Sequence, residues 1–170
     1  LQSQLEQKKM NEAEHTAVQM LSLKSDEFSA LAVMLQFAKD RNDVKTVTEY
    51  LEKLHVAQPD SSQILEQLCI SHINNKNREI AVQILEQAVK RVPGNEEFWQ
   101  LRFGIEQADH SAALNIIDRW LVEIPNSVMA CEALASVLEA AGEFKEASSA
   151  ADQALALSEA SPRAQFIKLR

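Results

Sequence analysis

The amino-acid sequence predicts an all-α protein in which antiparallel helix hairpins stack into an α-α superhelix. Three observations support this prediction. First, the 170 residues include only 3 Gly and 4 Pro, and 46% are hydrophobic, a composition that favours helices. Second, no stretch alternates apolar and polar residues for more than a few positions, as half-buried strands would. Third, prolines and apolar residues recur at a nearly constant interval, which is typical of repeat architectures.

The interval is visible in the second helix of each predicted pair. Pro59 and Pro93 lie 34 residues apart, and Pro125 follows 32 residues later. Upstream of them, steps of four and three residues place three mainly apolar columns on one helical face. These columns are Ala13, Val47, Ala81, Ala113 and Ala147; Ala17, Leu51, Leu85, Ile117 and Ala151; and Met20, Leu54, Ala88, Trp120 and Ala154.

The first helix of each pair carries columns of its own. One column consists of Leu31, Leu65, Trp99 and Cys131, and the next, three residues further on, of Met34, Leu68 and Leu134. Arg102 interrupts this second column. Each repeating unit is therefore predicted to consist of two amphipathic helices.

Polar breaks separate the paired helices at residues 41–43, 74–77, 108–110 and 141–143, where Asn, Asp and Gly suit tight turns. Ser61, Asn95, Ser127 and Ser161 are predicted to cap the first helices. We therefore interpret residues 1–170 as one array with a partial repeat at 1–27 and full repeats at 28–61 and 62–95. A shortened repeat at 96–127 and a repeat at 128–161 follow, and residues 162–170 begin a further repeat or form a terminal helix.

Two parts of this array depart from the pattern. The repeat at 96–127 is two residues short, which we assign to its turn around Ala108 to Ser111, and it carries Arg102 in an otherwise apolar column and Glu106 one turn further on. Local irregularity is predicted there. At the other departure, Leu1 to Met10 are interpreted as the tail of a first helix and its turn, so that a second helix would run from Met10 to Lys24.

The units resemble the tetratricopeptide repeat family, most closely at residues 78–93 and 134–154. This resemblance implies a right-handed superhelix whose first helices line a concave groove that holds a partner. The family's groove positions correspond here to Gln36, Lys39, Gln63, Glu66, Ile70, Ile73, Asn74, Gln100, Gln107, Met129, Glu132 and Ser136. Chaperone-adaptor members grip a terminal carboxylate with Lys, Asn and Arg. The corresponding places here hold Ala32, Glu66, Gln100 and Glu132, so such a clamp is not expected.

Several classes of function are not supported by the sequence. A net charge of -8 without a basic face argues against nucleic acid, and no apolar stretch approaches the length needed to span a bilayer. Cys69 and Cys131 form no metal or disulfide motif, and buried free thiols are expected. The four histidines fall on different helices or turns, and no catalytic fingerprint is present. We predict no enzyme activity, no cofactor and no metal.

The predicted function is that of a non-enzymatic protein-protein interaction scaffold that binds a protein or peptide partner. The segment is expected to come from a longer, bacterial array, and the alanine-rich last repeat suggests cell-envelope or exopolysaccharide secretion assembly. The alternative is a substrate-recognition or regulatory portion of an enzyme or peptide-responsive regulator. Exposed terminal helices are predicted to allow homo-oligomers, and a periplasmic and a cytoplasmic location both stay open.

Overall fold

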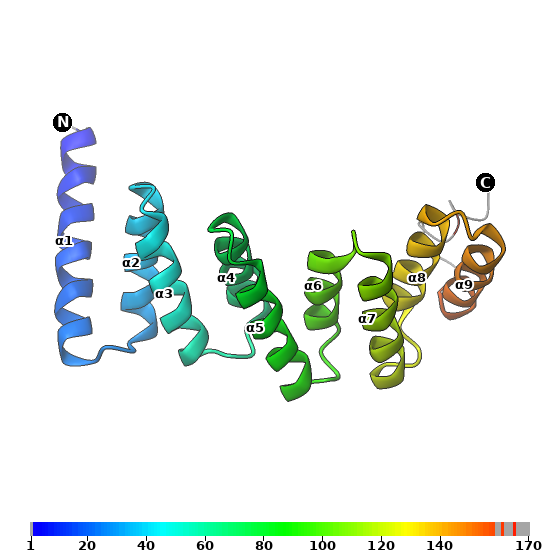
Figure 1. Cartoon of the computed structure of the whole chain (residues 1–170). Coiled ribbons are helices and arrows are strands. Elements are labelled where there is room, and N and C mark those ends of the chain that lie inside the picture. The colour runs from blue at the N-terminus through cyan, green and yellow to red at the C-terminus, as the bar shows by residue number, and fades with distance from the viewer. Residues whose placement is uncertain (1, 159–160, 162–164, 166–170) are drawn as a thin grey trace. The chain divides into compact units, whose positions relative to one another are not determined.

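The computed structural model describes residues 2–158, 161 and 165 of the chain, with side chains from residue 9 onward. Within these residues every regular element is a helix (Figure 1). The helices are α1 (Gln2–Leu23), α2 (Phe28–Asp40), α3 (Val44–Ala57), α4 (Ser62–Asn74), α5 (Arg78–Arg91), α6 (Glu96–Glu106), α7 (His110–Glu123), α8 (Val128–Ala140) and α9 (Phe144–Leu157). The all-α prediction is confirmed.

The chain divides within α5 into two compact units, Leu1–Ile84 (unit 1) and Leu85–Arg170 (unit 2). Each unit has its own core. In unit 1, leucines of α2, α3 and α4 pack together, namely Leu31, Leu35, Leu51, Leu54 and Leu68. In unit 2, small side chains let α8 and α9 approach closely, and the cluster comprises Cys131, Ala135, Leu138, Ala147, Ala150, Ala151 and Ala154.

The predicted apolar columns account for most of these buried positions. Ala81, Leu85 and Ala113, for example, expose none of their surface. In the second-helix columns the exceptions are Ala13 and Met20, which are exposed on α1, and Val47, which is half-buried; in the first-helix columns Met34 and Leu134 are half-buried. The predicted periodicity therefore identifies the packing face of the second helices in both units.

Three of the predicted breaks form the same helix-ending motif. Asn42, Lys76 and Gly142 have positive φ angles of 54°, 62° and 81°. In the first of these turns, the N–H of Asp43 donates to the carbonyl of Ala38 at 3.0 Å, and the N–H of Asn42 donates to that of Lys39 at 2.9 Å. This pair of bonds is the Schellman arrangement, which satisfies the last carbonyls of a helix.

Side-chain caps begin the next helices where the sequence predicts them. The Ser127 hydroxyl accepts a hydrogen bond from the N–H of Ala130 at 2.9 Å, and Asn95 accepts one from Glu97 at 3.0 Å. Ser61 caps α4 through Ile64. Three of the four predicted caps are thus confirmed. The prediction that Ser161 caps a helix falls on residues 162–164 and 166–170, which lie outside the described part of the chain.

Two details of the predicted helix boundaries are wrong. Helix α1 is continuous from Gln2 to Leu23, without a turn near Met10, because residues 2–23 contain no Gly or Pro to interrupt good helix formers. The two residues missing from the shortened repeat are lost from α6, which has 11 residues where α4 has 13, and not from its turn. The division into repeats at the proposed boundaries stays a prediction.

The irregular positions of the shortened repeat are paired with one another. Arg102 is buried and donates to the carboxylate of Glu106, and its Nε lies 3.8 Å from the carboxylate of Glu86. Arg119 of α7 donates two hydrogen bonds to Glu86, at 3.0 and 2.8 Å. We call Glu86, Arg102, Glu106 and Arg119 the charge cluster. Its pairs neutralise the charges that the sequence places inside an apolar stripe.

Candidate functional site

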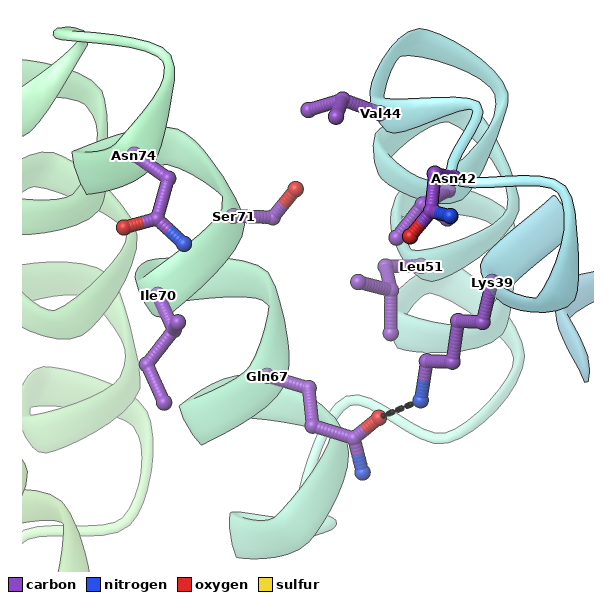
Figure 2. A pocket seen from close by; sticks show the side chains of 9 residues that line it. Lys39, Asn42, Val44, Leu51, Gln67, Ile70, Ser71 and Asn74 are labelled. Carbon is purple, nitrogen blue, oxygen red and sulfur yellow. Dashed lines mark hydrogen bonds between the residues drawn. The ribbon is translucent and has the colours of Figure 1, made fainter.

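A cleft of about 290 Å³ opens in unit 1 between α4 on one side and the α2–α3 hairpin on the other (Figure 2). Its walls combine apolar and polar side chains. We call it the unit 1 cleft, and the residues that line it are Lys39, Asn42, Val44, Val47, Leu51, Gln67, Ile70, Ser71 and Asn74. No described helix has both the length and the apolar character needed to cross a membrane.

The local fold places these side chains at fixed points around the cleft. Lys39 lies in the last turn of α2, and Asn42 occupies the left-handed position of the following turn. Valines and a leucine of α3 form the apolar wall behind them. The opposite wall is one face of α4, because Gln67, Ile70 and Asn74 follow one another at steps of three and four residues.

Hydrogen bonds fix some of the polar groups and leave others available. Lys39 Nζ donates to Gln67 Oε1 at 2.6 Å and so links α2 to α4 at one end of the cleft (Figure 2). The Ser71 and Thr48 hydroxyls lie 2.7 Å apart, and Asn75 donates to Thr48 at 3.1 Å. The side-chain amides of Asn42 and Asn74 make no hydrogen bond with any other described residue, so both can bind a ligand.

The cleft is positive although the chain as a whole is negative. Of its nine described lining residues, Lys39 alone carries a charge. The nearby Asp43 carboxylate is engaged by Thr46, whose hydroxyl and backbone N–H both donate to it, at 2.7 and 3.2 Å. The hydrogen bond from the Thr46 hydroxyl, and after it the one from the Thr46 N–H, lower the pKa of the Asp43 carboxyl. Asp43 therefore stays ionised, but it is not among the residues that line the cleft.

Of the seven groove residues that the sequence predicts in unit 1, the structure brings three together in the cleft. These are Lys39, Ile70 and Asn74. Gln36 instead donates to Asp40 at 2.8 Å along its own helix. The remaining three, Gln63, Glu66 and Ile73, are exposed on α4 outside the cleft lining.

The five predicted residues of unit 2 do not line a described cleft. Gln100 is exposed, Met129 is half-buried, and Gln107 donates to the carbonyl of Gly104 at 3.3 Å. Glu132 accepts a hydrogen bond from the hydroxyl of Ser161, whereas Ser136 donates to the backbone carbonyl of Glu132 at 2.8 Å. The latter two side chains therefore serve internal bonds in this structure.

A second cleft, of about 370 Å³, lies in unit 2 and was not anticipated from the sequence. It is lined by Val89, Lys90, Pro93, Trp99, Asp118, Arg119, Val122 and Glu123. The Trp99 indole donates to the carbonyl of Pro93 at 2.7 Å, and the Arg119 guanidinium lies over its ring, 5.4 Å from the centroid. The lining of this cleft contains two cations, Lys90 and Arg119, and two anions, Asp118 and Glu123, so its charges balance. Arg119 also donates hydrogen bonds to Glu86.

Both cysteines are free and buried, as the sequence predicts. Burial raises the pKa of the Cys69 thiol to about 12 and also raises that of Cys131. At pH 8 nearly all Cys69 thiols are therefore protonated in the folded chain, and the thiolate is the form that reacts. We expect a thiol reagent such as a disulfide dye to label Cys69 at pH 8 no faster than the chain opens. Rapid native-state labelling of Cys69, measured by mass spectrometry, would contradict this burial.

Comparison with known proteins identifies the fold. No protein-family model and no curated protein matches the chain. Among solved structures, it is similar to YrrB, described as a TPR protein with an unusual peptide-binding site, with a TM-score of 0.64 and 14% identity over 96% of this chain and 85% of that one. It is also similar to a tetratricopeptide repeat protein from Parabacteroides merdae, with a TM-score of 0.55 and 15% identity over 97% of this chain and 65% of that one. This chain has the tetratricopeptide repeat (TPR) fold.

A further TPR-like match is MamA, with a TM-score of 0.62 and 15% identity over 93% of this chain and 87% of that one. At such identities the similarity concerns the fold, and the chemistry must be argued from this chain's own side chains. In TPR terms, α2 and α3 form one hairpin of unit 1, and α4 is the first helix of the next. The unit 1 cleft thus lies between one hairpin and the helix that follows it.

Proposed function

We propose that this TPR segment is a non-enzymatic interaction scaffold and that its unit 1 cleft holds a short extended stretch of a partner polypeptide. The observation that carries the proposal is the pair of unengaged amides, Asn42 and Asn74, beside an apolar wall. Peptide-binding surfaces need both features, because an extended backbone presents polar groups while its side chains need apolar pockets.

The amides suit a polypeptide backbone in particular. A primary amide donates and accepts at once, so Asn42 and Asn74 can each pair with the N–H and C=O groups that an extended segment leaves unpaired. The apolar wall contains Val44 and Leu51 from α3, and Ile70 faces them from α4 (Figure 2). A cleft of about 290 Å³ is at the small end of ligand sites, which suits one anchoring side chain of a peptide. YrrB, a TPR protein described as having an unusual peptide-binding site, is consistent with this use of the fold.

Removing both amides tests the proposal. The double variant Asn42→Gly with Asn74→Ala is expected to bind peptides more weakly by about 1–3 kcal/mol, or about 5- to 150-fold in Kd, because each amide loses its hydrogen bonds. Glycine is chosen at position 42 because it accepts the positive φ without strain. Binding is measured by fluorescence polarisation with heptapeptides that the unaltered chain selects from a synthetic array.

The matched control is Gln83→Ala, which removes an exposed amide from α5 outside the cleft. It should leave peptide affinity unchanged, and circular dichroism should show all variants to be equally helical. An array from which no heptapeptide is retained would contradict the proposal. So would equal affinity of the double variant and the unaltered chain.

Other parts of the predicted function stay predictions. Assignment to a cell-envelope or exopolysaccharide secretion assembly has the alanine-rich α8 and α9 as its only support. Pairing between chains through terminal helices is supported by exposed apolar side chains on α1, such as Met10 and Val18. The remaining groove residues of unit 2 also stay candidates, since α6 and α8 expose Gln100 and part of Met129.

A further inference from the structure

We infer that the segment bound in the unit 1 cleft carries a single acidic side chain two residues from an aliphatic one, and that Lys39 binds its carboxylate. This inference rests on the proposed function, whose partner it defines chemically. It follows from the state of the Lys39 ammonium, from the charges around it and from the position of the apolar groups.

The Lys39 ammonium is positioned but not neutralised. Its one described hydrogen bond goes to the amide oxygen of Gln67 at 2.6 Å. An ammonium has three N–H donors, so two remain for a ligand. Gln67 is uncharged, and no described carboxylate lies within ion-pair distance of Lys39. The positive charge of Lys39 is therefore not neutralised, while the hydrogen bond to Gln67 of α4 fixes the position of its ammonium group.

The surrounding charges favour one acidic group and disfavour several. No acidic residue is among those that line the cleft. Two aspartates, Asp40 and Asp43, nevertheless follow Lys39 closely in the sequence and would repel further negative charges. A carboxylate that reaches Lys39 gains a charge-assisted hydrogen bond. A run of acidic residues would bring further negative charges toward a chain whose net charge is -8.

The unit 2 cleft lacks this preference and is a useful contrast. Its lining includes Lys90 and Arg119, but also Asp118 and Glu123, so the charges balance. Arg119 already donates two hydrogen bonds to Glu86, at 3.0 and 2.8 Å. An acidic ligand would have to displace these bonds. Of the two clefts, we therefore expect only the unit 1 cleft to prefer ligands with an acidic side chain.

An aliphatic neighbour is expected because the cleft exposes apolar surface close to Lys39. Val44 is 50% exposed and Ile70 is 49% exposed, and the two lie on opposite walls (Figure 2). Burying them against an aliphatic side chain removes apolar area from water. In an extended peptide, side chains two residues apart point to the same side at a separation of roughly 7 Å. An acidic and an aliphatic residue at that spacing can therefore enter the cleft together.

The test uses synthetic heptapeptides with Leu at the central position and Asp, Asn or Lys at one of the two positions that lie two residues from it. Acetylated and amidated ends leave the side chain as the only carboxylate. We expect the best Asp peptide to bind the unaltered chain about three- to tenfold more tightly than its Asn counterpart at low salt. The difference should shrink as salt is added.

Lys39→Met is expected to remove this preference for Asp while binding of the Asn peptide persists. Lys53→Met is the matched control, because Lys53 is also exposed on a helix of unit 1 but does not line the cleft. It should retain the preference. Methionine is unbranched like lysine and only one atom shorter, so both variants remove the charge with little change in shape, and circular dichroism checks their helicity.

The outcomes separate this inference from the proposed function. Equal affinity for Asp and Asn peptides, both lost in the double variant Asn42→Gly with Asn74→Ala, would overturn the acidic preference and leave peptide binding intact. A preference for Asp that survives Lys39→Met, or a preference for Lys peptides, would also overturn it. Absence of any binding that depends on the two amides would overturn the proposed function and this inference together.

Discussion

Replacing Phe98 with Ala is expected to destabilise unit 2 by about 3–5 kcal/mol, the usual cost of removing a large buried aromatic side chain. Phe98 is among the largest side chains with no exposed surface, and it lies in the first turn of the short helix α6. The loss combines the transfer of apolar area to water with the cavity that is left behind. Urea unfolding followed by circular dichroism measures the difference in unfolding free energy.

Phe144→Ala is the matched control, because the same group is removed from a phenylalanine that is 69% exposed at the start of α9. Its effect should stay within about 0.5 kcal/mol. In a repeat protein each element packs only on its neighbours, so hydrogen exchange should also show α6 and α7 opening more readily in Phe98→Ala. Equal destabilisation by both changes would show that the packing of Phe98 is misassigned.

Replacing Glu86 with Leu is expected to cost about 2–3 kcal/mol, because it removes the carboxylate on which the charge cluster converges. Arg102 is buried and would lose one of its two carboxylate neighbours, and Arg119 would lose both of its hydrogen bonds to Glu86. Breaking a fully buried pair costs about 3–5 kcal/mol. The smaller figure applies because the Arg119 side chain is 37% exposed and water compensates for part of the loss.

The informative comparison is the double variant Arg102→Leu with Glu106→Leu. It removes a buried cation and its partner together and restores apolar residues at both positions, so its stability should be close to or above that of the unaltered chain. Urea unfolding of both variants gives the two differences. If the double variant lost more unfolding free energy than Glu86→Leu, the charge cluster would stabilise the fold more than apolar side chains at the same positions.

The same cluster predicts a dependence on pH. Hydrogen bonds from Arg119, more than any other cause, hold the pKa of the Glu86 carboxyl below its usual range. A carboxyl with a lowered folded pKa stabilises the fold above its unfolded pKa, about 4.3, and this contribution disappears as the pH falls through the folded value. The stability difference between the unaltered chain and Glu86→Gln should therefore be present at pH 7 and vanish at strongly acidic pH.

Most of the fold could be predicted because one physical constraint repeats along the chain. Each hairpin must bury an apolar stripe against its neighbours, so the stripe recurs in register and identifies positions such as Leu85 and Ala113. The same interval also runs through Phe98, which shares a column with Ala30, Ile64 and Ala130. The amino-terminal part of the pattern was less informative, because residues 2–23 contain no Gly or Pro to mark the end of a helix.

The cleft could be predicted only in part. Lys39, Ile70 and Asn74 lie on first helices, where the family resemblance places the groove. Asn42 and Val44 were not predicted, because the groove that the resemblance implies is lined by first helices, whereas the turn and the second helix supply one wall of this cleft. The internal bond of Glu132 was also unpredictable, since its partner Ser161 lies 29 residues further on and is brought near only by tertiary packing.

The backbone at Asn42 limits how the cleft could be re-engineered. With φ at 54°, the position accepts asparagine or glycine readily, and most other side chains only with strain. A library that seeks new ligand preferences should therefore keep position 42 constant and diversify α4, whose helical backbone accepts nearly any side chain. Recognition in this cleft could then change on the α4 wall while the hairpin opposite retains both its geometry and its contribution to stability.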